Sequence, residues 1–536
     1  MQPVLIAGDW RPAAAVDSFR AIDPTSGAAS AELWPVSGWS DVEAALVAAT
    51  AAAAELSRMP AAAIAGFLDR YADRLAAVGT ELVAVAHAQT GLAMKPRLAE
   101  VELPRTLDQL RQAAAAAREG TWRMAMIDAP KNIRSAAFGL GPVVVLPPAN
   151  FPLAYGAVTG GDFAAAIAAG NPVIAKAHPG HPSVSCLAAR EAVHALRDTG
   201  LPVAAVQLLH GLTSDVGQRL VTDPRVGATG FTGSQETGKK LFAAASAAGR
   251  VIWVEMGSIN PVVLLPGALA DRGLEIAGEL TASVTGSAGQ FCTKPGLVFF
   301  LDDAAGQALA TATAERFQAI GGQVLLGTLG RERLVAAIDR LQAAGARRLA
   351  GDAAGDDGFA DQGPCRHRPT LLEVTAAELV ARPEALLVEA FGNATMLVRC
   401  AGVADLLQAV ACVPGSLGAS IYAAQDGRDD AAFEAVAAVL VPRAGRIVEN
   451  RMPTGLAVVP SMQHGGPWPS AGPPFFSAVG MPWTLLRFAR RICFDGWTQE
   501  RLPECLRNPV PPGEPWRFID SAWTRAAAGD DSAPGV

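Results

Sequence analysis

Short apolar runs alternate with helix-type segments along most of the chain, and this alternation limits the folds open to it. One series of runs covers residues 143–146, 173–175, 205–209, 227–231 and 251–254. A second series covers residues 261–265, 297–301, 371–374, 395–398 and 419–422, with helical segments such as residues 304–319 between them. Strands that alternate with helices form parallel sheets covered by helices on both faces. The sequence therefore predicts an α/β fold with two such sheets, preceded by a mostly helical region over residues 41–112.

Charge and cysteine content exclude several classes of protein. The 44 Lys and Arg residues against 51 Asp and Glu residues give a net charge of −7, which argues against a dedicated nucleic-acid partner. The most apolar region, residues 138–176, is broken by proline and glycine, so we expect no membrane span. Seven cysteines without a CxxC pair predict neither a disulfide framework nor a metal site. Residues 1–10 do not resemble a signal peptide, and we expect a cytoplasmic protein.

A glycine-rich turn follows the predicted strand at residues 227–231. The segment from Gly233 to Lys240 nearly matches the phosphate-binding P-loop, but Lys240 stands where that loop needs a Ser or Thr hydroxyl for magnesium. ATP hydrolysis is therefore disfavoured. The glycines also miss the GxGxxG spacing of a conventional dinucleotide site. Backbone N–H groups at such a turn still suit a pyrophosphate, although a tight turn without a ligand is equally consistent with the pattern.

Three polar residues lie at turns or strand ends and are candidates for a catalytic role. Cys292 lies among small residues between a helix and a strand, where a thiol is accessible enough to be a nucleophile, although a lone cysteine is usually a buried apolar residue. Glu255 ends an apolar strand, where a partly desolvated carboxylate serves as a base, although most glutamates are surface ion-pair partners or helix caps. Asn150 follows another strand, where its amide either stabilises an oxyanion or only holds the turn.

The order of these segments resembles the aldehyde dehydrogenase superfamily over about residues 20–507. The motifs around Cys292 (Gln-Phe-Cys-Thr-Lys-Pro-Gly-Leu), around Asn260 (Met-Gly-Ser-Ile-Asn-Pro) and around His464 (Met-Gln-His-Gly-Gly-Pro) are similar to the branch that contains 2-oxoglutarate semialdehyde dehydrogenases, to which NADP-dependent fatty aldehyde dehydrogenases are related. The resemblance implies an aldehyde dehydrogenase fold with a Rossmann-like cofactor domain, an α/β catalytic domain and a small oligomerisation element. We assign these to residues 1–120 and 138–256, to residues 257–460, and to residues 121–137 and 485–510, with a flexible tail at 524–536. A homodimer or homotetramer is implied.

The same resemblance implies a reaction. Cys292 would attack an aldehyde to form a thiohemiacetal, Asn150 would hold its oxyanion, and Glu255 would activate the water that hydrolyses the resulting thioester. The implied reaction is NAD(P)-dependent oxidation of an aldehyde, first of all 2,5-dioxopentanoate. Added tryptophans leave long-chain or aromatic aldehydes as an alternative. A catalytically silent binding module is disfavoured because all three residues are present.

Cofactor and substrate residues are carried over in the same way. The implied cofactor contacts are Lys176, His178, Gly233, Ser234, Glu389 and Phe391. Relatives that prefer NAD often carry a glutamate three residues after the lysine, and Pro179 at that position predicts NADP, with NAD as a further possibility. A solvated turn histidine is the alternative for His178. Asn393 replaces a usual proline, which predicts a less rigid loop. Phe151, Arg451 and Trp468 are the expected substrate contacts, although Arg451 also fits an ordinary surface arginine.

Overall fold

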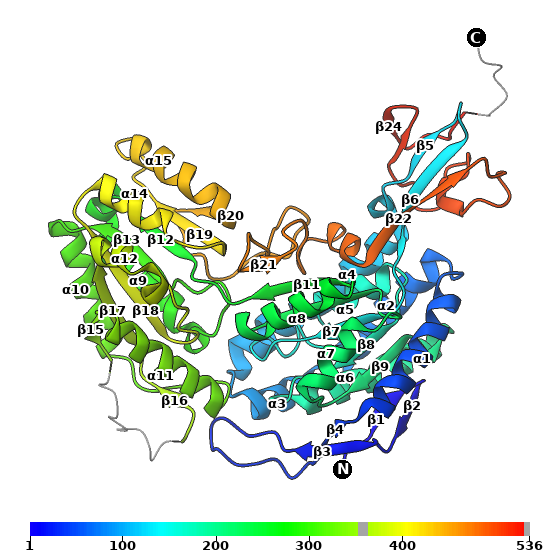
Figure 1. The fold of residues 1–536 in the computed structure, drawn as a ribbon, viewed down its shortest axis with the longest axis horizontal. Helices are drawn as coiled ribbons and strands as arrows, with labels where there is room; N and C mark the ends of the chain where they lie inside the picture. The colour runs from blue at the N-terminus through cyan, green and yellow to red at the C-terminus, as the bar shows by residue number, and fades with distance from the viewer. Residues whose placement is uncertain (352–362, 530–536) are drawn as a thin grey trace.

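The structure is a computed structural model that describes residues 1–351 and 363–529. Figure 1 shows two α/β lobes side by side and a smaller sheet that projects from one end of the molecule. Each lobe is built around one large sheet, as the alternation of apolar runs and helical segments predicts.

The first lobe contains an eight-stranded sheet in the order β2-β1-β9-β8-β7-β10-β11-β21. Its strands are β1 (Val4–Ile6), β2 (Asp9–Arg11), β7 (Val143–Leu146), β8 (Val173–Lys176), β9 (Val206–Leu209), β10 (Ala228–Gly233), β11 (Val251–Met256) and β21 (Ala471–Gly472). The five strands from β9 to β11 in this order are parallel, so their carboxyl ends lie along one edge. Ligands of parallel sheets bind beyond that edge.

Helices cover both faces of this sheet because its buried strands are apolar on both sides. Val143 and Val145 of β7 pack with α2, α4, α5 and α6, whereas Val144 packs with α1 on the opposite face. The helices of this lobe are α1 (Trp39–Leu56), α2 (Ala61–Ala77), α3 (Gly79–Thr90), α4 (Leu103–Glu119), α5 (Gly161–Ala168), α6 (Pro182–Thr199), α7 (Ser214–Thr222) and α8 (Gln235–Ala247). A distorted helical segment, η1 (Met94–Glu102), leads into α4.

The second lobe contains a seven-stranded sheet in the order β15-β17-β18-β13-β12-β19-β20. Its strands are β12 (Pro261–Leu264), β13 (Leu297–Leu301), β15 (Arg347–Ala350), β17 (Thr370–Thr375), β18 (Ala394–Cys400), β19 (Ser416–Tyr422) and β20 (Ala444–Glu449). Val262 and Leu264 pack toward α9 (Pro266–Thr285) and α10 (Ala304–Gln318). Val263 packs on the other face, toward α11 (Thr328–Ala343), α14 (Val403–Ala411) and α15 (Asp430–Leu440). The short helices α12 (Ala376–Ala381) and α13 (Pro383–Leu386) join β17 to β18.

The projecting sheet has the order β22-β6-β5-β23-β24. It consists of β5 (Met126–Asp128), β6 (Ile133–Gly139), β22 (Ala489–Asp495), β23 (Arg517–Ile519) and β24 (Ala522–Thr524). Two small pairs complete the described fold: β3 (Ala15–Phe19) with β4 (Trp34–Ser37), and β14 (Gln323–Val324) with β16 (Arg366–His367).

The predicted fold class is confirmed, and each predicted run overlaps an observed strand. The division into domains stays a prediction, and β21 shows that the first sheet also takes a strand from beyond residue 256. An exposed loop was expected over residues 350–364, of which 352–362 lie outside the described residues. The expected tail starts at the last residue of β24, and its residues 530–536 also lie outside them.

Among the described residues, each helix is too short or too polar to span a bilayer. Within residues 1–351 and 363–529, no group of three or more His, Cys, Asp or Glu side chains is arranged to hold a metal ion.

A buried ion pair joins the first lobe to the segment that leads into β22. Arg487, which is 1% exposed in the helical turn η7 (Trp483–Phe488), pairs with Asp162 in the first turn of α5. The main-chain oxygen of Arg487 also accepts a 2.6 Å hydrogen bond from Nε1 of Trp253 on β11. Removing one member of such a pair leaves a buried charge uncompensated.

We expect Arg487→Met to lower the free energy of unfolding by about 3–5 kcal/mol, because Asp162 then stays buried without its counter-ion. The matched control is Arg111→Met, which breaks the exposed 3.2 Å pair between Arg111 on α4 and Asp73 and costs at most about 1 kcal/mol. Denaturant unfolding of both variants and the wild type at one protein concentration measures the difference. Equal losses in the two variants would contradict the role given to the buried pair.

Candidate active site

Cys292 lies in the loop between a short helical turn, η4 (Gly286–Gly289), and β13. Gly289 at the end of that turn has φ +65°, and a Cβ there would come within 2.3 Å of the main-chain oxygen of Gly392. Glycine therefore lets this loop pass close to the main chain at Gly392. The Cys292 thiol is half-buried, and its Sγ lies 3.3 Å from Nε2 of His464.

Glu255 lies near the end of β11 and is 3% exposed. Its Oε1 accepts a 2.7 Å hydrogen bond from the main-chain N–H of Ala478. Its Oε2 has no hydrogen-bond partner among the described residues and lies 3.8 Å from Nε2 of His464. Burial raises the pKa of Glu255 to about 7. One carboxylate oxygen is thus held while the other is available to accept a proton near neutral pH.

Asn150 follows β7 and faces the loop that carries Cys292. Its Nδ2 donates a 2.9 Å hydrogen bond to the main-chain oxygen of Gln290, two residues before the thiol. Nη2 of Arg97 donates a 2.9 Å bond to the main-chain oxygen of Asn150. The structure therefore brings Cys292, Glu255 and Asn150 together, with His464 between the thiol and the carboxylate.

A buried ion pair holds the segment that follows Asn150. Arg97 in η1 pairs with Glu102, which is fully buried, and the guanidinium of Arg97 lies 4.3 Å from the ring centroid of Phe151. Oε1 of Glu102 accepts hydrogen bonds of 2.8 and 3.0 Å from the N–H groups of Leu153 and Ala154. This pair therefore holds the turn after Asn150. Sequence reasoning missed it because η1 lies about 50 residues before that turn.

Burial keeps the thiol and the imidazole neutral. It raises the pKa of Cys292 to about 12, with the nearby Glu255 charge adding to the effect. It lowers the pKa of His464 to about 3, with the positive charge of Arg105 adding to the effect. A neutral thiol beside a neutral imidazole and a carboxylate has a route for its proton when it attacks a carbonyl. Sequence reasoning used His464 only as part of a family motif and missed this position.

The predicted pyrophosphate and ribose contacts lie along the carboxyl edge of the first sheet. Lys176 ends β8, and Gly233 ends β10. Ser234 caps α8, and its side chain accepts a 3.4 Å hydrogen bond from the N–H of Thr237. Burial lowers the pKa of Lys176 to about 8. The first turn of α8 presents N–H groups that have no acceptor within the helix, which suits an anionic group at this edge.

His178 lies in the turn after β8, close to Lys176. Its ring stacks on His181 at 5.1 Å, and its Nδ1 accepts a 3.0 Å hydrogen bond from the N–H of Gly180. Burial holds the pKa of His178 well below its ordinary value. His178 is therefore a neutral, half-buried turn residue, and Pro179 beside it is exposed.

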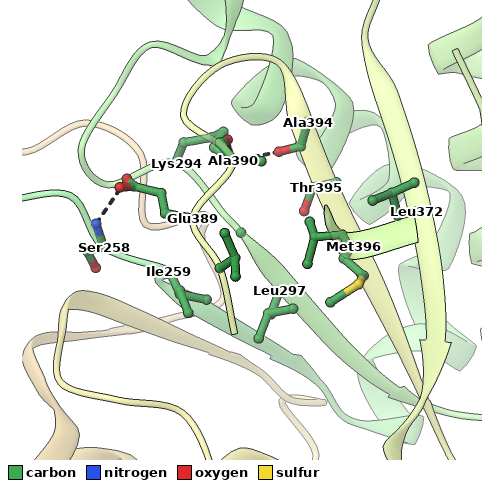
Figure 2. Close-up of a pocket in the computed structure, with 13 residues that line it drawn as sticks. Ser258, Ile259, Lys294, Leu297, Leu372, Glu389, Ala390, Ala394, Thr395 and Met396 are labelled. Carbon is green, nitrogen blue, oxygen red and sulfur yellow. Dashed lines mark hydrogen bonds between the residues drawn. The ribbon is translucent and has the colours of Figure 1, made fainter. Parts of the chain in front are cut away.

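Glu389 lies directly against the backbone that follows Glu255. Figure 2 shows its carboxylate turned toward Ser258, whose N–H donates a 3.0 Å hydrogen bond to Oε1. A Cβ at Gly257 would lie 1.8 Å from Oε2 of Glu389, so this approach requires glycine. Burial raises the pKa of Glu389 to about 7 and lowers that of the neighbouring Lys294 to about 8. Lys294 donates to the main-chain oxygens of Ala390 and Ala394.

Phe391 is half-buried in the loop between Glu389 and β18. Asn393 in this loop is fully buried, and its Nδ2 donates to Oε1 of Gln323 at 2.9 Å and to the main-chain oxygen of His367 at 3.0 Å. The expectation that Asn393 loosens the loop therefore finds no support, because its amide ties the loop to the β14–β16 pair.

The three expected substrate residues have different surroundings, and their role stays a prediction. Phe151 lies at the site, with its ring 5.8 Å from that of Phe291, the neighbour of Cys292. Arg451 is exposed just after β20. Trp468 packs against Phe242 of α8, with the ring centroids 5.2 Å apart and the rings tilted.

Comparison with known proteins gives one consistent answer. The aldehyde dehydrogenase family model matches residues 10–471. The chain is 37% identical over 522 residues to alpha-ketoglutaric semialdehyde dehydrogenase 2 of Azospirillum brasilense, covering 95% of this chain and 97% of the relative. It is 33% identical over 459 residues to alpha-ketoglutaric semialdehyde dehydrogenase of Acinetobacter baylyi, covering 83% and 85%.

Solved structures share the fold. Aldehyde dehydrogenase C of Pseudomonas syringae, a variant in complex with NAD+ and octanal, superimposes with a TM-score of 0.79 at 20% identity, covering 94% of this chain and 98% of that one. Lactaldehyde dehydrogenase of Escherichia coli gives a TM-score of 0.77 at 22% identity, covering 92% and 98%.

We expect Glu255→Gln to speed alkylation of Cys292 by iodoacetamide at pH 8.5 by about threefold or more. The ionised Glu255 raises the pKa of the thiol, so removing its charge lowers that pKa and increases the thiolate fraction. Peptide-resolved mass spectrometry follows the reaction, with Cys412 as the internal reference. An unchanged rate at Cys292, or an equal change at Cys412, would contradict the electrostatic link between the two groups.

Proposed function

The chain belongs to the aldehyde dehydrogenase family, and from this premise we propose that it oxidises 2,5-dioxopentanoate to 2-oxoglutarate by covalent catalysis at Cys292. Family membership makes it an oxidoreductase that acts on aldehydes, which confirms the resemblance found in the motifs. The observation that carries the mechanism is the contact chain from the Cys292 thiol through His464 to Glu255, at 3.3 and 3.8 Å. The two curated relatives described above, both named for alpha-ketoglutaric semialdehyde, support the choice of substrate.

The residues along the sheet edge fit a nicotinamide dinucleotide. Gly233 and Ser234 at the start of α8 would face the pyrophosphate, Lys176 and His178 the adenosine ribose, and Glu389 with Phe391 the nicotinamide end. The N–H groups in the first turn of α8, which have no acceptor within the helix, support this fit for the pyrophosphate. We infer a preference for NADP, with NAD also accepted, because Pro179 places no carboxylate where a 2′-phosphate would meet it.

The first half of the reaction forms a bond to sulfur. Cys292 Sγ attacks the aldehyde carbon as the thiol proton passes through His464 Nε2 toward the ionised Glu255, and the Asn150 amide with the Cys292 N–H stabilises the oxyanion. Glu255 releases this proton to solvent before the second half of the reaction. A bound nicotinamide supplies the acceptor for the hydride that leaves this thiohemiacetal. The loss of hydride converts the adduct on Cys292 to a thioester.

The second half of the reaction releases the acid. Glu255 Oε2 removes a proton from water as the water attacks the thioester carbonyl, and the Cys292 thiolate leaves. Raising the pKa of Glu255 to about 7 makes it a stronger base than an exposed glutamate. Its presence favours hydrolysis over transfer of the acyl group to another acceptor.

We also propose that the chain forms a homodimer or homotetramer through the projecting sheet. β22 is an edge strand of that sheet, so its outer backbone groups are free to pair with another chain. Exposed Trp497, which follows β22, and exposed Trp523 on β24, the opposite edge strand, add apolar surface suited to burial between subunits.

The direct test measures kcat/KM for 2,5-dioxopentanoate and for octanal, each with NADP and with NAD, from the absorbance of the reduced nicotinamide. We expect 2,5-dioxopentanoate with NADP to exceed the octanal reactions by about tenfold or more. Cys292→Ala should bind cofactor and form no product. A higher kcat/KM for octanal would favour the long-chain alternative. Wild-type protein inactive with every aldehyde would favour a silent binding module.

We expect Glu255→Gln to stop after one turnover. It should release about one reduced cofactor per subunit and leave Cys292 acylated, with steady-state kcat about 100-fold lower. Wild-type kcat should rise between pH 6 and 8, because Glu255 with a pKa of about 7 must lose its proton to act as a base. Stopped-flow fluorescence and intact-protein mass spectrometry measure both effects. Glu275→Gln, at an exposed position on α9, is the control, and a missing burst would contradict the assignment.

A further inference from the structure

A half-buried arginine on α4 lies beside the aromatic wall of the site without an assigned role. The guanidinium of Arg105 lies 5.1 Å from the ring centroid of Tyr155 and 5.6 Å from that of Phe151. The Tyr155 ring lies 6.1 Å from the ring of His464, which contacts the Cys292 thiol. The rings of Tyr155 and His464 therefore connect Arg105 to the reacting sulfur.

Three other arginines around this group already have hydrogen-bond or ion-pair partners. Arg97 pairs with Glu102, and Arg487 pairs with Asp162. Nη1 of Arg446 donates to the main-chain oxygen of Gly455 at 2.8 Å, and its Nη2 donates to that of Pro453. None of these groups is left to receive an anion.

Arg105, in contrast, bonds only to neutral groups. Its Nε donates to Oε1 of Gln109 at 3.0 Å, and its Nη2 donates to the Tyr155 hydroxyl oxygen at 3.1 Å. Over residues 1–351 and 363–529, no carboxylate pairs with it within 4.0 Å. Burial raises the pKa of Tyr155, so its hydroxyl keeps its hydrogen and is able to donate it. The Arg105 guanidinium and the Tyr155 hydroxyl are thus neighbouring donors, and no carboxylate of the described residues pairs with the guanidinium.

The charge of Arg105 acts on the reaction centre. Although burial dominates in each case, the guanidinium lowers the pKa of Glu255, of Cys292 and of His464. Such an effect requires the cation to share the poorly solvated space of these three groups. An anionic substrate group entering this space would meet Arg105 with little screening by water.

We propose that Arg105, together with the Tyr155 hydroxyl, binds the carboxylate end of an aldehyde substrate whose other end reacts at Cys292. The inference rests on the proposed function and names a residue that selects the substrate within it. Guanidinium groups bind carboxylates through two parallel hydrogen bonds. An extended five-carbon semialdehyde places its carboxylate roughly 5 Å from its carbonyl carbon, since each C–C bond is about 1.5 Å long. Phe151 and Tyr155, whose rings pack edge to face, hold the guanidinium in place through cation–π contacts.

The test compares 2,5-dioxopentanoate with pentanal, which has the same number of carbons and no carboxylate, at pH 8.5. Arg105→Met keeps most of the side-chain volume and removes the charge, whereas Arg105→Lys keeps the charge. Arg111→Met removes an exposed charge from the same helix and is the matched control. Thermal unfolding of all variants checks that the fold is intact.

We expect Arg105→Met to lower kcat/KM for 2,5-dioxopentanoate by about 30-fold or more, mainly through a higher KM, and for pentanal by less than about threefold. Arg105→Lys should recover part of the loss with the anionic substrate only. Equal losses with both substrates, or no loss with either, would overturn the proposal.

A wrong substrate assignment and a wrong assignment of Arg105 give different results. If the wild type oxidises pentanal but not 2,5-dioxopentanoate, the substrate assignment is wrong, and the same variants are assayed with succinic and glutaric semialdehydes. A preference for these acids that Arg105→Met removes would still support the carboxylate site. Wild-type activity restricted to uncharged aldehydes would refute both proposals.

Discussion

The desolvation of Glu255 is the constraint on which the rest of the site depends. A carboxylate that is 3% exposed is costly to ionise, and only its Oε1 receives a hydrogen bond, from the N–H of Ala478. The unpaired Oε2 and the pKa of about 7 make it a base, and its charge also raises the pKa of the nearby thiol. The thiol therefore rests in the neutral form, and its proton leaves through His464, 3.3 Å away, toward Glu255.

Buried ion pairs keep this arrangement in place. Arg97 and Glu102 fix the turn that carries Asn150, and Asp162 and Arg487 pair close enough to Glu255 to affect its pKa. Asp162 and Arg487 lie 325 residues apart, and the Arg97–Glu102 pair bonds to the segment from Asn150 to Ala154, so both hold parts of the site that meet only in the complete fold. Such pairs contribute little net stability compared with apolar packing, but losing one partner is costly, which suits a scaffold that must hold one geometry.

The sequence predicted what depends on local pattern and on family motifs. The strands at 143–146, 173–175 and 251–254 are continuous apolar runs, and the structure contains them. Asn150, Glu255 and Cys292 were found because each follows a strand or a turn. Arg97 and Arg105 were missed because a single arginine in a helical segment carries no signal until its neighbours are known. β23 and β24 were missed because three-residue strands are too short to show a pattern.

The positions of the tryptophans bear on the choice between charged and bulky substrates. Long-chain or aromatic aldehydes were considered because Trp253 and Trp468 stand near the catalytic motifs in the sequence. In the fold, Trp253 is 9% exposed and donates its Nε1 hydrogen to Arg487, and Trp468 stacks on α8. Neither ring belongs to the group around the thiol, where Phe151, Tyr155 and the cation of Arg105 are found. A half-buried cation without a carboxylate partner beside the reacting group is better matched by a short substrate that brings its own carboxylate than by an uncharged aliphatic chain.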